Sequence, residues 1–400
     1  MEVRKGYKQT ELGIIPENWE VNKLEYYWTV VDCKHITAEF VQDGIPLASI
    51  TEVQNLFVDL TNAMQTTDFF YEKLIEGGRK PSIGDLIFSR NATVGEVAQV
   101  MEWHPRFAMG QDVCLLRKQK LKYSTGYLQS VIKSSIIRKQ LENLMVGSTF
   151  KRVNIEQIRS FSIPFPPPKE QTAIATALSD ADALITSLEK LIAKKRLIKQ
   201  GAMQELLSPT GLDGRSKDGW VVKKLGEIAK VTMGQSPLSE FYNTQGIGLP
   251  LIQGNADVEN RKTIVRTYTS VVTKQGKVGD TIMSVRAPVG EISKATFDCC
   301  LGRGVCAISF KNEFLYHFLL YFEQSWAKFS TGSTFDSVNS KQVKELEIPI
   351  PKSEAEQTRI ANILSDMDAE ITTLETKLEK YRKIKLGMMQ ELLTGKIRLV

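Results

Sequence analysis

The chain has 400 residues, of which 42% are hydrophobic and 24% are charged, a composition that excludes disordered, collagen-like and disulfide-scaffold proteins. At roughly 100–200 residues per domain, this length predicts two to four domains. The net charge of +6, from 52 basic and 46 acidic residues, is spread over the whole chain, so charge alone does not indicate a nucleic-acid-binding segment.

The first part of the chain, residues 1–165, is predicted to be a globular domain of mixed α/β structure. Residues 84–89 (GDLIFS) and 113–116 (VCLL) are rich in β-forming side chains and are bounded by turn residues, which is typical of strands. Residues 147–150 (GSTF) have the composition of a loop.

A long helix is predicted next, within residues 166–209. Apolar residues recur there at alternating spacings of four and three, the heptad pattern of a helix with one apolar seam. A proline-rich stretch precedes the helix, and Pro209 and Gly211 end it. At about 1.5 Å per residue, residues 171–207 span roughly 55 Å. The seam residues are Ile174, Leu178, Ile185, Leu188 and Ile192.

The second half of the chain has the same order of parts. We expect a second globular domain at residues 210–351, with a buried helix at 314–322 and a loop at 330–335. A second long helix is expected within residues 352–400. Its seam residues are Ile360, Leu364, Met367, Ile371, Leu374 and Leu378.

An internal repeat relates the two halves. Residues 171–207 and 357–393 are identical at 23 of 37 positions, at an offset of 186. The match continues upstream from 147–166 to 332–351, and more weakly from 84–98 to 279–293. An ordinary amphipathic helix packed on its own domain would explain each heptad seam. The repeat favours a different arrangement, in which the two near-identical helices pair antiparallel with each other. The predicted fold class is therefore α+β, with two pseudo-symmetric globular domains separated by an antiparallel coiled coil.

The sequence shows no motif for catalysis, and we predict neither a cofactor nor a metal. A phosphate-binding G-x-x-x-x-G-K-[ST] loop and a G-x-S-x-G nucleophile motif are both missing. The three histidines are isolated, and Cys299, Cys300 and Cys306 lack a fourth ligand nearby. Because no signal peptide or run of about 18 apolar residues occurs, we expect a cytoplasmic protein with reduced thiols.

Several of these features resemble one family. The two variable domains alternating with repeated helices, the GSTF segment followed by IP-P and EQ, the ending MQELL, and the opening GYKQTELGIIPENWEV are similar to the DNA-specificity subunit of type I restriction–modification systems. The resemblance implies that each variable domain is a target recognition domain that reads one half of a bipartite, asymmetric DNA site.

The same resemblance implies a set of partners. The helix pair would set the spacing between the half-sites and dock two copies of the methyltransferase (modification) subunit, after which the restriction/translocase subunit joins. It implies a non-catalytic subunit within a larger adenine methyltransferase and endonuclease.

Candidate DNA contacts follow from the chemistry of recognition. Forked or bidentate groups read base edges, whereas cations and hydroxyls bind phosphates. We expect specificity at positions that differ between the two copies, and fold or backbone contacts at identical ones. The candidates are Arg90, Asn91, Gln111, Ser148, Thr149, Lys151 and Arg152 in the first copy, and Ser284, Arg286, Arg303, Ser333 and Thr334 in the second.

Two other classes of protein remain open on the sequence. One is a restriction enzyme or methyltransferase that acts alone, which the missing motifs disfavour. The other is a coiled-coil adaptor whose globular domains bind protein. A methyltransferase gene beside this one would favour the specificity subunit.

Overall fold

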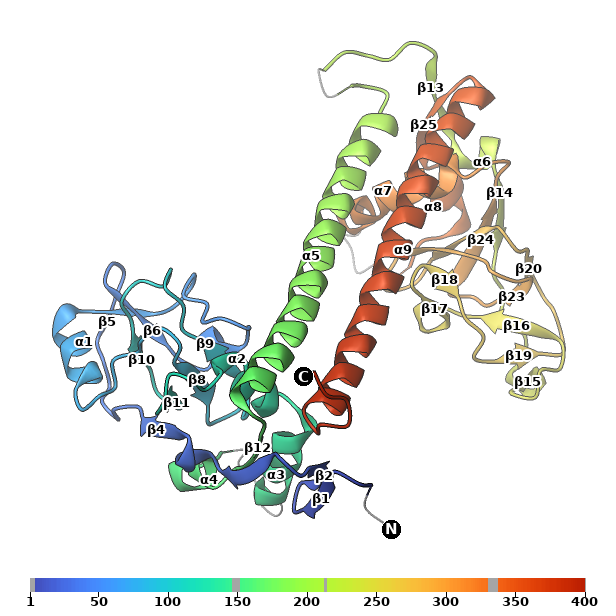
Figure 1. Ribbon diagram of the computed structural model, residues 1–400. Coiled ribbons are helices and arrows are strands. Elements are labelled where there is room, and N and C mark those ends of the chain that lie inside the picture. The colour runs from blue at the N-terminus through green and yellow to red at the C-terminus, as the bar shows by residue number, and fades with distance from the viewer. Residues whose placement is uncertain (1–3, 146–151, 212–213, 330–336, 400) are drawn as a thin grey trace. The chain divides into compact units, whose positions relative to one another are not determined.

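The computed structural model describes residues 4–145, 152–211, 214–329 and 337–399. The chain forms two compact units (Figure 1). Unit 1 comprises Met1–Glu189 and Lys377–Val400, and unit 2 comprises Lys190–Thr376. The two long helices, α5 (Pro168–Leu206) and α9 (Glu354–Leu392), each contribute to both units. The boundary between the two units lies within α5 and α9, whereas the predicted domain boundaries lie at the ends of these helices.

Unit 1 contains two four-stranded sheets and two strand pairs. The central sheet is antiparallel, in the order β4-β11-β8-β9, and the second sheet has the order β10-β6-β7-β5. The strands are β1 (Tyr7–Thr10), β2 (Gly13–Pro16), β3 (Glu20–Lys23), β4 (Trp28–Asp32), β5 (Phe40–Val41), β6 (Ile45–Ala48), β7 (Gln65–Thr66), β8 (Leu86–Ser89), β9 (Val97–Gln99), β10 (Ala108–Met109), β11 (Val113–Lys118) and β12 (Ser162–Phe165). The shorter helices are α1 (Asp68–Ile75), α2 (Thr125–Ile132), α3 (Ser135–Met145) and α4 (Ile155–Arg159).

Unit 2 is built on a six-stranded sheet, β14-β24-β21-β22-β18-β17, and a five-stranded sheet, β15-β19-β16-β23-β20. The strands are β13 (Trp220–Lys224), β14 (Lys230–Met233), β15 (Tyr242–Asn243), β16 (Leu249–Ile252), β17 (Val258–Glu259), β18 (Lys262–Thr263), β19 (Tyr268–Thr269), β20 (Gln275–Gly276), β21 (Thr281–Ser284), β22 (Ile292–Lys294), β23 (Cys299–Leu301), β24 (Val305–Ser309) and β25 (Glu347–Pro351). The shorter helices are α6 (Leu225–Ile228), α7 (Phe314–Phe329) and α8 (Ser340–Lys344). The predicted strands at 84–89 and 113–116 and the predicted helix at 314–322 are confirmed as β8, β11 and α7.

The strand register makes the two central sheets equivalent residue by residue. In unit 1, Cys114 pairs with Asp32 on one side and Phe88 on the other. In unit 2, Cys306 pairs with Met233 and Met283. The repeat therefore extends into strands whose sequences have diverged, and it assigns Met233 as the counterpart of Asp32. It likewise assigns Val285 as the counterpart of Arg90, one residue after β21 and β8.

The long helices contact each other in both units through the same ion pairs. In unit 1, Asp182 pairs with Lys385 and Glu189 with Arg382, at 2.5 and 2.7 Å. In unit 2, Asp368 pairs with Lys199 and Glu375 with Arg196, at 2.5 and 2.6 Å. The four pairs form two equivalent sets at the offset of 186 found in the sequence. Within each unit, higher residue numbers on α5 face lower numbers on α9, so the paired segments are antiparallel.

The predicted seam residues are withdrawn from solvent. Eight of them are buried, and Ile185, Met367 and Leu374 are half-buried. The seam also reaches the globular cores, because Ile174 and Leu178 belong to the unit 1 core and Ile360 and Leu364 to the unit 2 core. Within the described residues, no helix is long and apolar enough to span a membrane, and all five cysteines are free and buried.

A buried histidine connects α7 to the helix pair in unit 2. His317 is 1% exposed, and its Nε2 lies 2.9 Å from Ser365 Oγ on α9. Burial, with the nearby Lys199 and Lys294 ammonium groups, lowers the pKa of His317 to about 3. The imidazole is therefore neutral at pH 7, so its 3.9 Å approach to Asp368 is not an ion pair.

This pKa shift predicts a specific acid sensitivity. Between pH 6.5 and about 3, the unfolded chain binds a proton at His317 that the folded chain does not, so stability falls as the pH is lowered through this window. The contribution reaches about 1.4 kcal/mol per pH unit. The variant His317→Gln, which retains a polar partner for Ser365, is expected to show a shallower loss in urea titrations at pH 7, 6, 5 and 4. A parallel loss in both proteins would contradict the assignment.

Candidate nucleic-acid interface

Four segments of unit 1 meet at one end of the central sheet, where β4 and β8 end and β11 begins. The backbone N–H of Arg90, just after β8, donates to the Asp112 carbonyl at 2.8 Å, and Val153 N–H donates to the Arg90 carbonyl at 2.9 Å. Asn91 also forms an isolated β-bridge with Arg152. The end of β4 joins this edge because the Arg90 side chain bonds Asp32. We call residues 32–35, 90–93, 110–112 and 152–154 the unit 1 rim.

Unit 2 repeats this arrangement with the same backbone bonds. Val285 N–H donates to the Gly304 carbonyl and Val338 N–H to the Val285 carbonyl, both at 2.9 Å. Arg286 forms a β-bridge with Ser337. Arg303 N–H donates to Ser236 Oγ at 3.0 Å, which adds the end of β14. Residues 233–236, 285–288, 302–304 and 337–339 are the unit 2 rim.

Two of the predicted DNA contacts, Arg90 and Ser284, have side chains that are buried within the fold. Arg90 is 5% exposed, its guanidinium pairs with Asp32, and its Nε donates to the Val153 carbonyl at 3.3 Å. Ser284 is 4% exposed, and its Oγ donates to the Pro288 carbonyl and accepts from Glu291 N–H. These two side chains hold the rim loops in place.

The other candidates in the described residues lie on the rims. Gln111, Arg152, Arg286 and Arg303 are exposed, and Asn91 is half-buried, with its Oδ1 accepting from Ala92 N–H at 2.9 Å. The remaining candidates lie outside the described residues: Ser148, Thr149, Lys151, Ser333 and Thr334.

Sequence reasoning missed part of each rim. His35, Asp112 and Ser236 are rim residues that the repeat does not reveal, because the copies share no identity at these positions. The only signal is three-dimensional, in the equivalent register of β4 with β14 and of β11 with β24.

The cations of the unit 1 rim all have carboxylate partners. Arg90 pairs with Asp32, Arg152 with Asp112 at 3.4 Å, and Lys34 with Glu76. Asp32, Cys33 and His35 place donor atoms within 4.8 Å of one another, but Arg90 already engages Asp32, and burial raises the pKa of the Cys33 thiol. This group therefore does not favour a metal site.

The buried pair in the unit 1 rim gives a testable energetic prediction. Arg90→Val leaves the half-buried Asp32 with only the exposed His35 imidazole beside it, at an expected cost of about 2–3 kcal/mol. Asp32→Met leaves the buried Arg90 guanidinium without a counter-charge, at an expected cost of about 3–5 kcal/mol. The double variant installs the Val285–Met233 combination of unit 2, and we expect it to be more stable than either single variant. Denaturant unfolding of all four proteins measures this coupling. Additive losses would contradict the role given to the pair.

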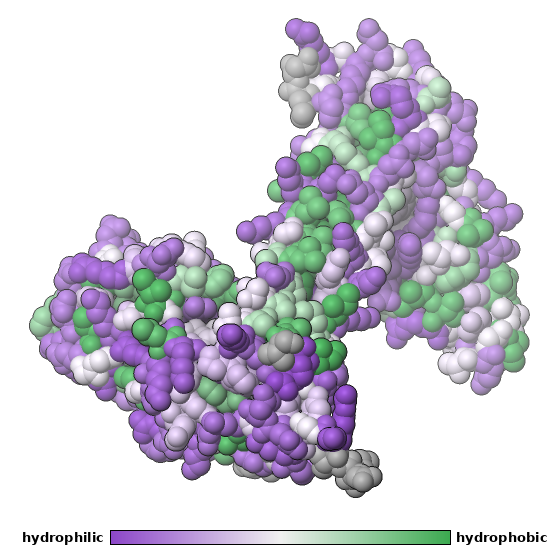
Figure 2. All heavy atoms as spheres, viewed as in Figure 1, coloured by the Kyte–Doolittle hydropathy of each residue, from purple (hydrophilic) through white to green (hydrophobic). Residues whose placement is uncertain are grey.

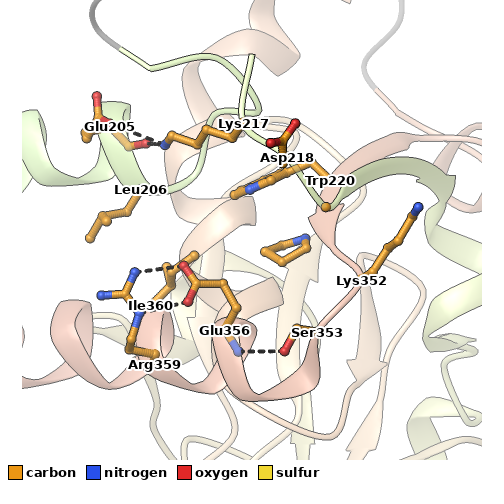
Figure 3. A pocket seen from close by; sticks show the side chains of 12 residues that line it. Glu205, Leu206, Lys217, Asp218, Trp220, Lys352, Ser353, Glu356, Arg359 and Ile360 are labelled. Carbon is orange, nitrogen blue, oxygen red and sulfur yellow. Dashed lines mark hydrogen bonds and ion pairs between the residues drawn. The ribbon is translucent and has the colours of Figure 1, made fainter. Parts of the chain in front are cut away.

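Unit 2 also contains a pocket of about 460 Å³, away from its rim (Figure 3). It is lined by the end of α5, the start of β13 and the start of α9, with the half-buried Trp220 on one wall. Its charged groups are largely paired with one another, Lys217 with Glu205 and Arg359 with Glu356 (Figure 3).

The equivalent place in unit 1 is filled by the end of the chain. Trp19 and Glu170, the counterparts of Trp220 and Glu356, are both 0% exposed, and the indole N–H donates to Glu170 Oε2 at 3.0 Å. Arg398 donates to both Glu170 oxygens, at 2.5 and 2.8 Å. Tyr7 Oη donates to the Gly395 carbonyl at 3.0 Å. In unit 2, Arg359 supplies the guanidinium from within α9, and the pocket remains open.

Comparison with known proteins decides the class of this chain. The model of the type I restriction modification DNA specificity domain matches it twice, at residues 16–199 and 217–382. The chain belongs to this family. Membership confirms the prediction of a specificity subunit and excludes both a self-sufficient restriction enzyme and a methyltransferase. Each match begins shortly before an equivalent tryptophan, Trp19 in the first copy and Trp220 in the second, and ends within a long helix.

Curated relatives match this chain over all or part of its length. The chain is 32% identical to a putative type I restriction enzyme MjaX specificity subunit of Methanocaldococcus jannaschii, over 98% of this chain and 97% of the relative. It is 24% identical to the EcoKI specificity subunit of Escherichia coli over 60% of this chain and 54% of the relative.

Solved structures show the same fold. A type I restriction–modification system S subunit from M. genitalium superposes with a TM-score of 0.64, at 16% identity over 98% of both chains. A chain from a structure of type I restriction–modification complex assembly gives 0.63, at 22% identity over 96% of this chain and 99% of that one.

Proposed function

We propose that each unit of this specificity subunit reads one half of a bipartite, asymmetric duplex DNA site through its rim. The proposal rests mainly on the two rims, which have the same backbone hydrogen bonds but different side chains. The two rims share their backbone bonds, yet Asn91, Gln111 and Arg152 are replaced by Arg286, Arg303 and Ser337. A backbone frame shared by the two copies, with polar groups that differ between them, is what two readers of different sequences require.

The candidates outside the described residues complete this proposal. Ser148, Thr149 and Lys151 precede the last segment of the unit 1 rim, residues 152–154, in sequence. Ser333 and Thr334 precede the last segment of the unit 2 rim, residues 337–339. Their hydroxyl and ammonium groups suit phosphate contacts, which position a protein on DNA without reading it. We also retain the predicted division into recognition domains (1–165 and 210–351) and spacer helices (166–209 and 352–400).

The helix pair is proposed to be the spacer and the docking site. A spacer shared by two copies of one unit fits the equivalent ion pairs along α5 and α9. Figure 2 shows apolar side chains gathered along α5, and in unit 2 Leu191, Leu197 and Ile198 are 38, 68 and 46% exposed. An exposed apolar stripe of this kind marks a contact surface for another protein. We assign it to two methyltransferase subunits, with the restriction/translocase subunit joining the complex in the cytoplasm.

Methylome sequencing tests the proposed function. The chain is expressed with its methyltransferase subunit in a host that lacks other adenine methylation, and methylated adenines are mapped. We expect one asymmetric motif with two specified halves and a gap of fixed length. A single uninterrupted motif, or methylation that does not depend on this chain, would overturn the proposal. Expression of the methyltransferase alone is the control.

A further inference from the structure

The two rims differ sharply in whether their cations are free. All three cations of the unit 1 rim are paired with carboxylates, as described above. Arg286 and Arg303 are the only charged residues of the unit 2 rim. Both are exposed, and neither guanidinium has a hydrogen bond or ion pair to another described residue.

The difference arises from the residues that replace the unit 1 carboxylates. Met233 stands where unit 1 has Asp32, and Gly304 where it has Asp112. A Cβ atom at Gly304 would lie only 2.1 Å from the Gln253 carbonyl oxygen. The backbone of unit 2 therefore excludes an acidic side chain at the position that neutralises Arg152 in unit 1.

The two free arginines are held next to each other on a fixed frame. The bond from Val285 N–H to the Gly304 carbonyl joins the residues adjacent to Arg286 and Arg303. Ser284 and the bridge to Ser337 fix the loop that carries Arg286, and Ser236 fixes the turn that carries Arg303. The backbone is therefore anchored at both arginines, whereas their guanidinium groups are not.

A free guanidinium on a fixed backbone has a preferred partner in the major groove. Its two parallel N–H groups match O6 and N7 of guanine, whereas Asn and Gln amides match N6 and N7 of adenine. We propose that unit 2 reads guanine in its half-site through Arg286 and Arg303, and that unit 1, with Gln111 at the Arg303 position, reads its half-site without a free arginine. This inference rests on the proposed function of the rims.

The test uses Arg286→Gln, Arg286→Lys, Arg303→Gln and Arg303→Lys in the complex with the methyltransferase subunit. Methylomes are mapped, and binding is measured on duplexes that vary at each specified position. We expect each variant to lose about 10- to 100-fold discrimination for guanine at one position of one half-site, with the other half-site and the gap unchanged. Lysine keeps the charge but lacks the fork, so it should not restore discrimination.

A matched charge change away from the rim is the control. Lys277→Gln removes an exposed cation from unit 2 and should leave the motif unchanged. A uniform loss of affinity across all sequences, with a salt slope reduced by about one and rescue by lysine, would show phosphate contacts and overturn guanine reading. Loss of discrimination in both half-sites would also overturn it.

The wild-type motif separates this inference from the proposed function. If the wild-type chain directs no bipartite methylation, the proposed function fails. If the motif is bipartite but neither half contains guanine, or if the arginine variants keep full discrimination, only the assignment of Arg286 and Arg303 fails.

Discussion

Replacing Arg398 with Gln is expected to destabilise unit 1 by about 2–4 kcal/mol, because it leaves the fully buried Glu170 carboxylate without its cation. This loss of stability is smaller than for a fully buried ion pair, because the Arg398 side chain is 27% exposed and partly screened by solvent. Trp19 N–H would remain as a donor to Glu170 but cannot neutralise its charge. At about 2–4 °C per kcal/mol for a unit of this size, the expected fall in Tm is roughly 4–16 °C.

Unit 2 supplies the matched control for this experiment. Arg359→Gln removes the guanidinium from the equivalent Glu356, but this pair is on the surface, with side chains 59 and 38% exposed. Exposed pairs contribute little, so we expect no measurable change in Tm. Calorimetry of the two variants beside the wild type measures the contrast. Equal losses in both would show that the end of the chain does not stabilise unit 1 through Glu170.

Lengthening both long helices by one turn is expected to change the gap between the half-sites and nothing else. We insert four helix-forming residues after Glu189 in α5 and four after Thr376 in α9, where the chain passes from one unit to the other. The insertions leave the ion pairs within each unit intact. Four residues add about 6 Å, which corresponds to one or two base pairs at roughly 3.4 Å each.

The comparison is with a chain that carries the insertion in α5 alone. That insertion shifts the register between the helices and places the seam out of phase, so we expect loss of methylation. The matched insertion should give a methylome with the same two half-sites and a longer gap. An unchanged gap, or altered half-sites, would contradict the role of the helices as a spacer.

Much of the architecture could be predicted because it depends on local patterns. The heptad spacing from Ile174 to Ile192 predicts α5, and the repeated sequence from Ile360 onward predicts α9. The β-rich runs predict β8 and β11. In each case the period of the apolar residues reflects the element directly, and no distant contact is needed.

The rims could be predicted only in part because they are assembled from distant segments. Arg90 has a side chain that suits a DNA contact. In the fold, however, its guanidinium binds Asp32 and Val153, which are both about 60 residues away in sequence. The Glu170–Arg398 pair joins residues separated by 228 positions. In unit 2 the equivalent Glu356 instead pairs with Arg359 of its own helix, so the repeat does not reveal the role of Arg398. Bonds of this kind leave no periodic signal in a single sequence.

The central claim is that each unit reads its own half-site. Its most direct test is the methylome of a chain in which β13 to β25, Trp220–Pro351, is replaced by the corresponding segment of a relative with a known target. The account predicts that one half-site changes to that of the donor, while the other half-site and the gap stay the same. A change in both half-sites, or in neither, would contradict it.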